Sequence, residues 1–146
     1  MVVSCMQGEV KNLSESKDEA FANKISGDGV LITPSSNLIV APFDGQVVIV
    51  FETKHAIILR SDDGLAMVIH IGVETEKLSG IGFDVKVVDG QDIKKGDLLM
   101  RIDTSYLASI DYNIDTHILF PSLGIRNLEN IHYGSINFLD SLCEIK

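Results

Sequence analysis

Short apolar runs separated by polar turn residues dominate the pattern along this chain. Each run holds four to seven residues, mostly β-branched or aliphatic, and Gly-Asp clusters lie between them. Short strands with turn signals at such intervals are typical of an all-β sandwich or barrel. The expected strands cover residues 30–33, 46–51, 56–60, 65–71, 84–88 and 97–102.

Helical periodicity is weak by comparison. "SESKDEAFANK" at 14–24 and "TSYLASI" at 104–110 could each form one or two turns of helix. No linker, low-complexity tract or charge block divides the chain. We therefore expect one all-β domain over residues 1–146, with one or two short helical turns.

Composition and charge narrow the class of protein. The net charge of −9 predicts an acidic surface, which argues against nucleic acid or anionic membrane and favours a basic protein partner. Cys5 and Cys143 lie at opposite ends without the spacing of a zinc site. No signal peptide and no apolar run of the roughly 20 residues that span a membrane are present. These features predict a soluble, cytoplasmic protein.

Two of the four histidines stand inside apolar runs of one hairpin, "ETKHAIILRSDDGLAMVIHIGVET" at 52–75. The flanking runs are strand-like, and the Ser-Asp-Asp-Gly between them has the residues of a tight turn. How His55 and His70 meet depends on the length of that turn.

A four-residue loop at 61–64 would set Arg60 opposite Leu65. His55 would then lie directly opposite His70, with their Cβ atoms about 4.5–5.5 Å apart. In this register the two imidazoles share one face of the sheet.

A two-residue loop at Asp63–Gly64 is the alternative. It would set His55 opposite Gly72 and His70 opposite Ile57. The residue composition does not decide between these registers, but only the first would let the two histidines act together.

Two facing imidazoles in an apolar setting favour the neutral form, because burial and mutual repulsion both oppose protonation. A neutral imidazole can attack an electrophile or bind a metal. Thr53, two residues before His55, offers a hydroxyl to fix its tautomer. Gly72, two residues after His70, would let a backbone N–H approach an anion. The arrangement suits capture of a phosphoryl group by histidine.

Other readings stay open at this point. The histidines could be structural residues, or they could bind zinc, for which Glu74 is the nearest third ligand by strand parity and a fourth would be needed for a structural site. His117 and His132 lie in the less regular C-terminal part, and we expect both at the surface.

With these residues in view, the sequence resembles the glucose-type enzyme IIA domain of the bacterial phosphoenolpyruvate-dependent sugar phosphotransferase system. The resemblance runs from about Gly8 to Ile145. Its most specific elements are the paired "TKHA" and "VIHIG", followed by "LSGIGF". Supporting segments are "EAFANKISGDGVLITP", "VAPFDGQVVIVFETKHAI" and "GQDIKKGDLL".

The resemblance implies an antiparallel β-sandwich, or distorted barrel, that serves a phosphorelay. It implies that His70 accepts a phosphoryl group from the phosphohistidine of HPr and passes it to a cysteine of a cognate enzyme IIB domain during sugar import. His55 would stabilise that group, and Thr53 would support His55. No metal or cofactor is required, although His55 and His70 could hold an incidental zinc ion.

The resemblance also implies a partner surface around the histidines. Phe21, Ile25 and Phe51 match apolar contact positions of the family. Asp18 and Glu74 match acidic positions suited to a basic face of HPr.

The C-terminal third follows the family only loosely, and lacks its usual Ser-x-x-x-Pro-Val strand. A chiefly regulatory domain, which binds transporters or enzymes according to its phosphorylation state, is the alternative function. A biotinyl or lipoyl carrier is disfavoured, because the hairpin tip "SDDG" has no lysine.

Overall fold

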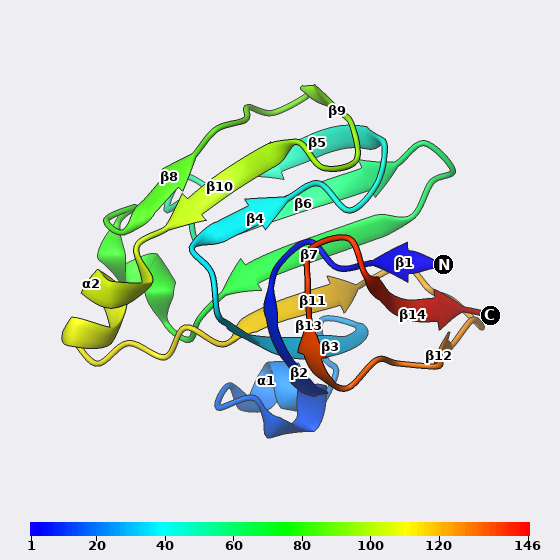
Figure 1. Cartoon of the computed structure of the whole chain (residues 1–146), viewed down its shortest axis with the longest axis horizontal. Helices are drawn as coiled ribbons and strands as arrows, with labels where there is room; N and C mark the ends of the chain where they lie inside the picture. The colour runs from blue at the N-terminus through cyan, green and yellow to red at the C-terminus, as the bar shows by residue number, and fades with distance from the viewer.

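The computed structural model describes all 146 residues and consists mainly of short antiparallel strands (Figure 1). The strands are β1 (Val2–Val3), β2 (Gly8–Asn12), β3 (Asp28–Pro34), β4 (Leu38–Val40), β5 (Gly45–Val50), β6 (Ala56–Ser61), β7 (Ala66–Ile71), β8 (Phe83–Val85), β9 (Asp92–Ile93), β10 (Leu98–Ile102), β11 (Thr116–Phe120), β12 (Leu128–Glu129), β13 (Gly134–Ile136) and β14 (Ser141–Ile145). The helices are η1 (Leu13–Glu15), α1 (Glu19–Ala22), η2 (Thr75–Leu78) and α2 (Thr104–Ser109). None of them has the length and apolar composition that a transmembrane helix needs.

The strands form one large sheet and two small ones. The large sheet has the order β13-β2-β3-β11-β7-β6-β5-β9, and the small sheets have the orders β4-β10-β8 and β1-β14-β12. Figure 1 shows β4, β10 and β8 in front of β5 and β6, so the sheets form two layers. The expected β-sandwich is therefore confirmed, as are short helices within 14–24 and 104–110.

Alternation of side chains in the large sheet separates a core face from an outer face. In β7, Met67, Ile69 and Ile71 belong to a core cluster of 27 buried residues between the layers. Val68 and His70 alternate with them and lie on the outer face, because successive residues of a strand point to opposite sides. The hydrophobic effect buries Met67, Ile69 and Ile71 and thereby fixes their alternating neighbours on the outer face.

The segment of residues 13–22, which contains η1 and α1, covers part of this outer face. Leu13, Leu31 and Leu119 are almost fully buried but do not belong to the main core cluster. Leu31 of β3 and Leu119 of β11 lie on the face away from the core, under the segment that Leu13 begins. The segment thus closes a second, smaller apolar cluster beside His70.

The hairpin of β6 and β7 has neither of the two expected registers. Ala56, not His55, lies opposite His70, and the loop consists of Asp62, Asp63 and Gly64. Both predicted registers were wrong by one residue, in opposite directions. Gly64 has a φ of 94° and allows a three-residue loop, in which a type I turn is followed by a left-handed residue.

Two glycines allow a prediction about stability. A Cβ at Gly29 would collide with the carbonyl oxygen of Ile118 in the neighbouring strand, whereas a Cβ at Gly64 would meet open space. We expect Gly64→Ala to lower the free energy of unfolding by about 1–2 kcal/mol through its positive φ alone. Gly29→Ala should cost about 3 kcal/mol or more, since two backbones must separate. Urea unfolding of both variants checks the order, and equal losses would contradict this account.

Candidate functional site

His70 lies near the end of β7, on the outer face of the large sheet. Its cross-strand neighbours are Ala56 of β6 and His117 of β11. The Nδ1 atom of His70 is buried and has no hydrogen-bond partner, whereas Nε2 is not buried. Any group that reacts with His70 from outside therefore meets Nε2.

His55 reaches His70 through a kink in the chain rather than through strand pairing. The residue before it, Lys54, has a left-handed φ of 59°, and β6 begins only after His55. The His55 carbonyl accepts a hydrogen bond from the Ile71 N–H at 2.8 Å. The His55 and His70 ring centroids lie 4.8 Å apart at an interplanar angle of 89°. The two imidazoles thus meet as expected, but by a different route.

Thr53 and Phe51 fix the orientation of the His55 ring. The hydroxyl oxygen of Thr53 lies 2.6 Å from His55 Nδ1, and the Phe51 ring packs edge-on with a centroid distance of 5.6 Å. His55 is 5% exposed. Its Nδ1 is occupied by Thr53, so Nε2 is the nitrogen left for other partners.

His117 was expected at the surface, and that prediction was wrong. It is completely buried in β11, directly opposite His70, with a ring centroid distance of 5.4 Å. Its Nε2 lies 2.6 Å from the Ser16 hydroxyl and its Nδ1 3.2 Å from the His70 carbonyl oxygen. The run "THILF" places this histidine among apolar residues, which is the signal that singled out His55 and His70. His132 is exposed, as expected.

The apolar and acidic residues before β3 lie over the histidines. The ring of Phe21 in α1 packs on His70 at 4.6 Å and on His117 at 4.3 Å between centroids. Asp18 caps α1 by accepting hydrogen bonds from the N–H groups of Ala20 and Phe21. Ile25, at the end of this segment, is 75% exposed. Phe21 thus contacts two of the histidines, whereas Ile25 is an exposed apolar side chain shortly after α1.

Gly72 does not offer its N–H to a ligand, contrary to expectation. The N–H donates to the Asp115 carbonyl at 3.0 Å, because β7 is still paired with the strand beside it. Its φ of 74° turns the chain, and a Cβ there would collide with the Asn113 carbonyl. Gly72 therefore shapes the end of the strand instead of binding an anion.

Glu74 does not lie on the face of His70 either. That prediction assumed that the strand continues past Gly72, with every second residue on the same face. The chain turns at Gly72 instead, and Glu74 itself has a left-handed φ of 59°. Its exposed carboxylate pairs with Lys77 at 3.3 Å. Glu76, two residues further on, takes the expected place beside both histidines, with a carboxylate oxygen within 4.8 Å of their nitrogens.

His55, His70 and Glu76 could together hold a metal ion, because one ligand atom from each lies within 4.8 Å of the others. Two imidazoles and a carboxylate are a ligand set that zinc accepts. A metal at this position would occupy the accessible nitrogen of His70. Metal binding and any reaction at that nitrogen would therefore compete.

Burial lowers the pKa of all three histidines, and repulsion by the other two adds to this at His70. Burial, then the charges of His55 and His117, lower the pKa of His70 to about 4, against weaker opposition from Asp18 and the Gly72 backbone. Burial lowers the pKa of His55, and the carboxylate of Glu76 partly offsets this. Burial likewise lowers the pKa of His117. At neutral pH the site therefore presents lone pairs rather than cations.

Comparisons with known proteins give a family and a similar solved structure. The family described as "phosphoenolpyruvate-dependent sugar phosphotransferase system, EIIA 1" matches residues 1–123. Among solved structures, the glucose permease IIA from Mycoplasma capricolum is similar, with a TM-score of 0.91 and 33% sequence identity. The similarity covers 97% of this chain and 92% of that one, so it extends over the C-terminal strands that the family match leaves out.

The low pKa of His70 predicts how stability depends on pH. Between about pH 6.5 and pH 4 the unfolded chain binds a proton at this residue and the folded protein does not, so acidification favours unfolding. His70→Asn lacks this proton site. From pH 7 to pH 4 we expect the wild type to lose up to about 3 kcal/mol more unfolding free energy than the variant. Urea unfolding at several pH values measures the difference, and parallel curves would contradict a depressed pKa.

Proposed function

The chain belongs to the EIIA 1 family of the phosphoenolpyruvate-dependent sugar phosphotransferase system, and we propose that it carries the phosphoryl group on Nε2 of His70. The observation that carries the proposal is the state of His70: neutral, half-buried, with Nδ1 enclosed and Nε2 accessible. A phosphoryl carrier needs one nucleophilic nitrogen that a partner protein can reach.

The transfer is a displacement at phosphorus. The Nε2 lone pair of His70 forms the new N–P bond while the bond to the donor histidine of HPr breaks, and that electron pair returns to the donor imidazole. In the second step a thiolate of the cognate enzyme IIB attacks the same phosphorus, and the pair returns to Nε2. The low pKa of His70 supports this role, since its lone pair is free at neutral pH.

His55 would stabilise the phosphoryl group without carrying it. If the Thr53 hydroxyl donates to His55 Nδ1, the ring proton lies on Nε2, the nitrogen left free beside His70. That N–H can donate to a phosphoryl oxygen in a partly dehydrated site, where such bonds are strong. The carboxylate of Glu76 partly offsets the effect of burial on the His55 pKa and so favours protonation of this ring.

The surroundings of the histidines fit a protein partner better than a small substrate. Neither His55 nor His70 lines any of the five surface hollows of the molecule. Phe21 and Phe51 pack on the two imidazoles and would limit the access of water, which hydrolyses phosphohistidine. An open, apolar surface on a protein of net charge −9 suits a basic partner such as HPr.

The role in sugar transport follows from this relay. We propose that HPr is the donor and an enzyme IIB domain the acceptor, that both meet the chain in the cytoplasm, and that the transfer needs neither metal nor organic cofactor. Ile25, exposed shortly after α1, is an apolar contact for either partner. Asp18 is an acidic contact, whereas Glu74, paired with Lys77, would lie further out.

Phosphorylation by phosphoenolpyruvate, enzyme I and HPr, read by intact mass, tests the proposal. We expect wild type to gain one acid-labile phosphoryl group and His70→Ala to gain none. His55→Ala should accept the group but pass it to enzyme IIB about a hundredfold more slowly, because a donor to the phosphoryl oxygens is lost. Thr53→Val should show a smaller defect in the same step.

His132→Ala is the matched control, since His132 is exposed. This variant should behave as wild type in both steps. A folded wild type that takes up no phosphoryl group, or one that is still labelled without His70, would refute the assignment.

A further inference from the structure

His117 has a pattern of contacts that the phosphoryl transfer itself does not use. The ring is completely buried, so it cannot accept a phosphoryl group, yet it contacts His70, Phe21 and Ser16. Through β11 it links the backbone of His70 to Ser16 of the segment of residues 13–22 by hydrogen bonds. The question is what this link does for the reacting nitrogen.

The hydrogen bonds of His117 have a defined direction. The His70 carbonyl can only accept, so Nδ1 of His117 carries the proton and donates. Nε2 then accepts from the Ser16 hydroxyl, whose oxygen accepts from the N–H of Asp18 at 3.1 Å. One chain of bonds therefore runs from the start of α1 to the backbone of His70.

The same ring supports Phe21 from below. Phe21 packs on His117 at 4.3 Å and on His70 at 4.6 Å, so its position depends on both imidazoles. Phe21 is itself only half-buried and has solvent on its other side. A shift of α1 would thus uncover His70 directly.

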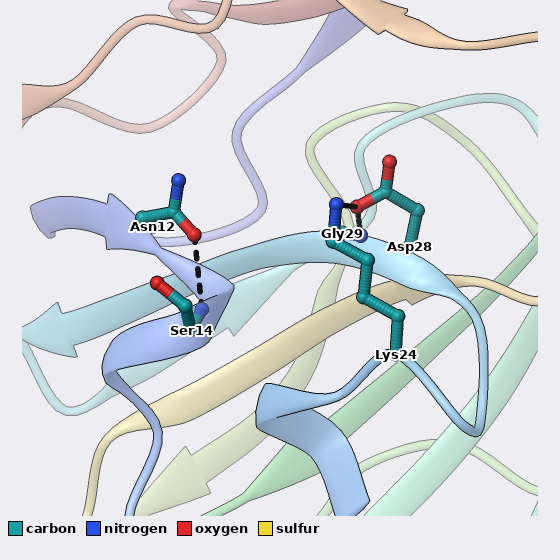
Figure 2. A network of polar contacts seen from close by, with 5 residues as sticks. All are labelled: Asn12, Ser14, Lys24, Asp28 and Gly29. Atoms are coloured by element: carbon teal, nitrogen blue, oxygen red, sulfur yellow. Dashed lines mark hydrogen bonds and ion pairs between the residues drawn. The ribbon is translucent and has the colours of Figure 1, made fainter.

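The polar side-chain contacts at the two ends of this segment are largely exposed. Figure 2 shows Asn12 accepting from the Ser14 N–H at one end, and Lys24 paired with Asp28 near the other. The Lys24 and Asp28 side chains are 54% and 33% exposed, and such ion pairs add little. Leu13 and Phe21 hold this segment to the sheet by apolar and ring contacts, and the Ser16–His117 bond is the side-chain hydrogen bond between the segment and the sheet.

We propose that His117 is a positioning residue of the site: through Ser16 it holds α1 so that Phe21 covers the His70 imidazole and leaves Nε2 open. Only the effect of His117 on phosphoryl transfer depends on the proposed function. The placement of Phe21 is a property of the folded protein alone and can be measured separately.

Ser16→Ala tests the proposal because it removes the bond without emptying the core position of His117. Ser14→Ala, on the same segment but with an exposed side chain, is the matched control, and Ser16→Thr, which keeps a hydroxyl, is the rescue variant. Each variant is phosphorylated through HPr, and three quantities are measured: KM for phospho-HPr, kcat, and the half-life of the phosphohistidine.

In Ser16→Ala we expect KM to rise roughly three- to tenfold and the half-life to fall by a similar factor, with kcat within about twofold of wild type. These changes follow if α1 presents a displaced docking surface and admits water to His70. Ser14→Ala and Ser16→Thr should resemble wild type. A Ser16→Ala protein with unchanged KM and half-life would overturn the proposal, as would equal effects in Ser14→Ala.

NMR separates this inference from the proposed function. Cross-relaxation between the ring protons of Phe21 and His70 should be strong in wild type and weak in Ser16→Ala, whether or not the protein is phosphorylated. Retained ring contacts in Ser16→Ala would overturn the positioning role. A wild type that accepts no phosphoryl group would instead overturn the proposed function and leave the measured placement of Phe21 standing.

Discussion

The pairing of β7 with β6 on one side and β11 on the other is the constraint on which the site depends. It turns Met67, Ile69 and Ile71 into the core and thereby commits His70 to the outer face, between Ala56 and His117. A shift by one residue in either pairing would bury His70 in the core and expose three large apolar side chains. The energy of the core therefore enforces the position of the reactive histidine.

The electrostatic character of the site follows from that position. Three imidazoles gather on a face that α1 and Phe51 partly cover, so burial disfavours the charged form of each, and the other two imidazoles add to this effect at His70. The acidic groups nearby, Glu76 at His55 and Asp18 at His70, oppose this effect without cancelling it. The burial that keeps a histidine lone pair available at neutral pH therefore also makes the folded protein less stable in acid.

Sequence patterns predicted the sandwich, most of its longer strands and the meeting of His55 with His70. They failed where the chain leaves regular geometry. Lys54, Gly64 and Gly72 have left-handed backbones, which changed the approach of His55, the hairpin register and the side of Glu74. The Gly72 N–H prediction failed because that N–H still pairs with Asp115 of the neighbouring chain segment.

His117 was missed for a different reason. The segment of residues 13–22 covers it, and Ser16 of that segment, which bonds to His117, lies 101 positions earlier in the chain. Periodicity within a strand cannot show what packs on its outer face, because that contact is tertiary. The apolar context of "THILF" is nevertheless the same as that of "VIHI", and by the same reasoning it indicates a third buried imidazole.

The strand pairing at the chain ends has a consequence for biosynthesis. Val2 and Val3 of β1 pair with β14, so during synthesis β1 leaves the ribosome long before its partner strand. At about 5–20 residues per second this delay is on the order of ten seconds. Two residues offer too short an edge to recruit another chain efficiently during that time. The short length of β1 thus protects the nascent protein until β14 has been made.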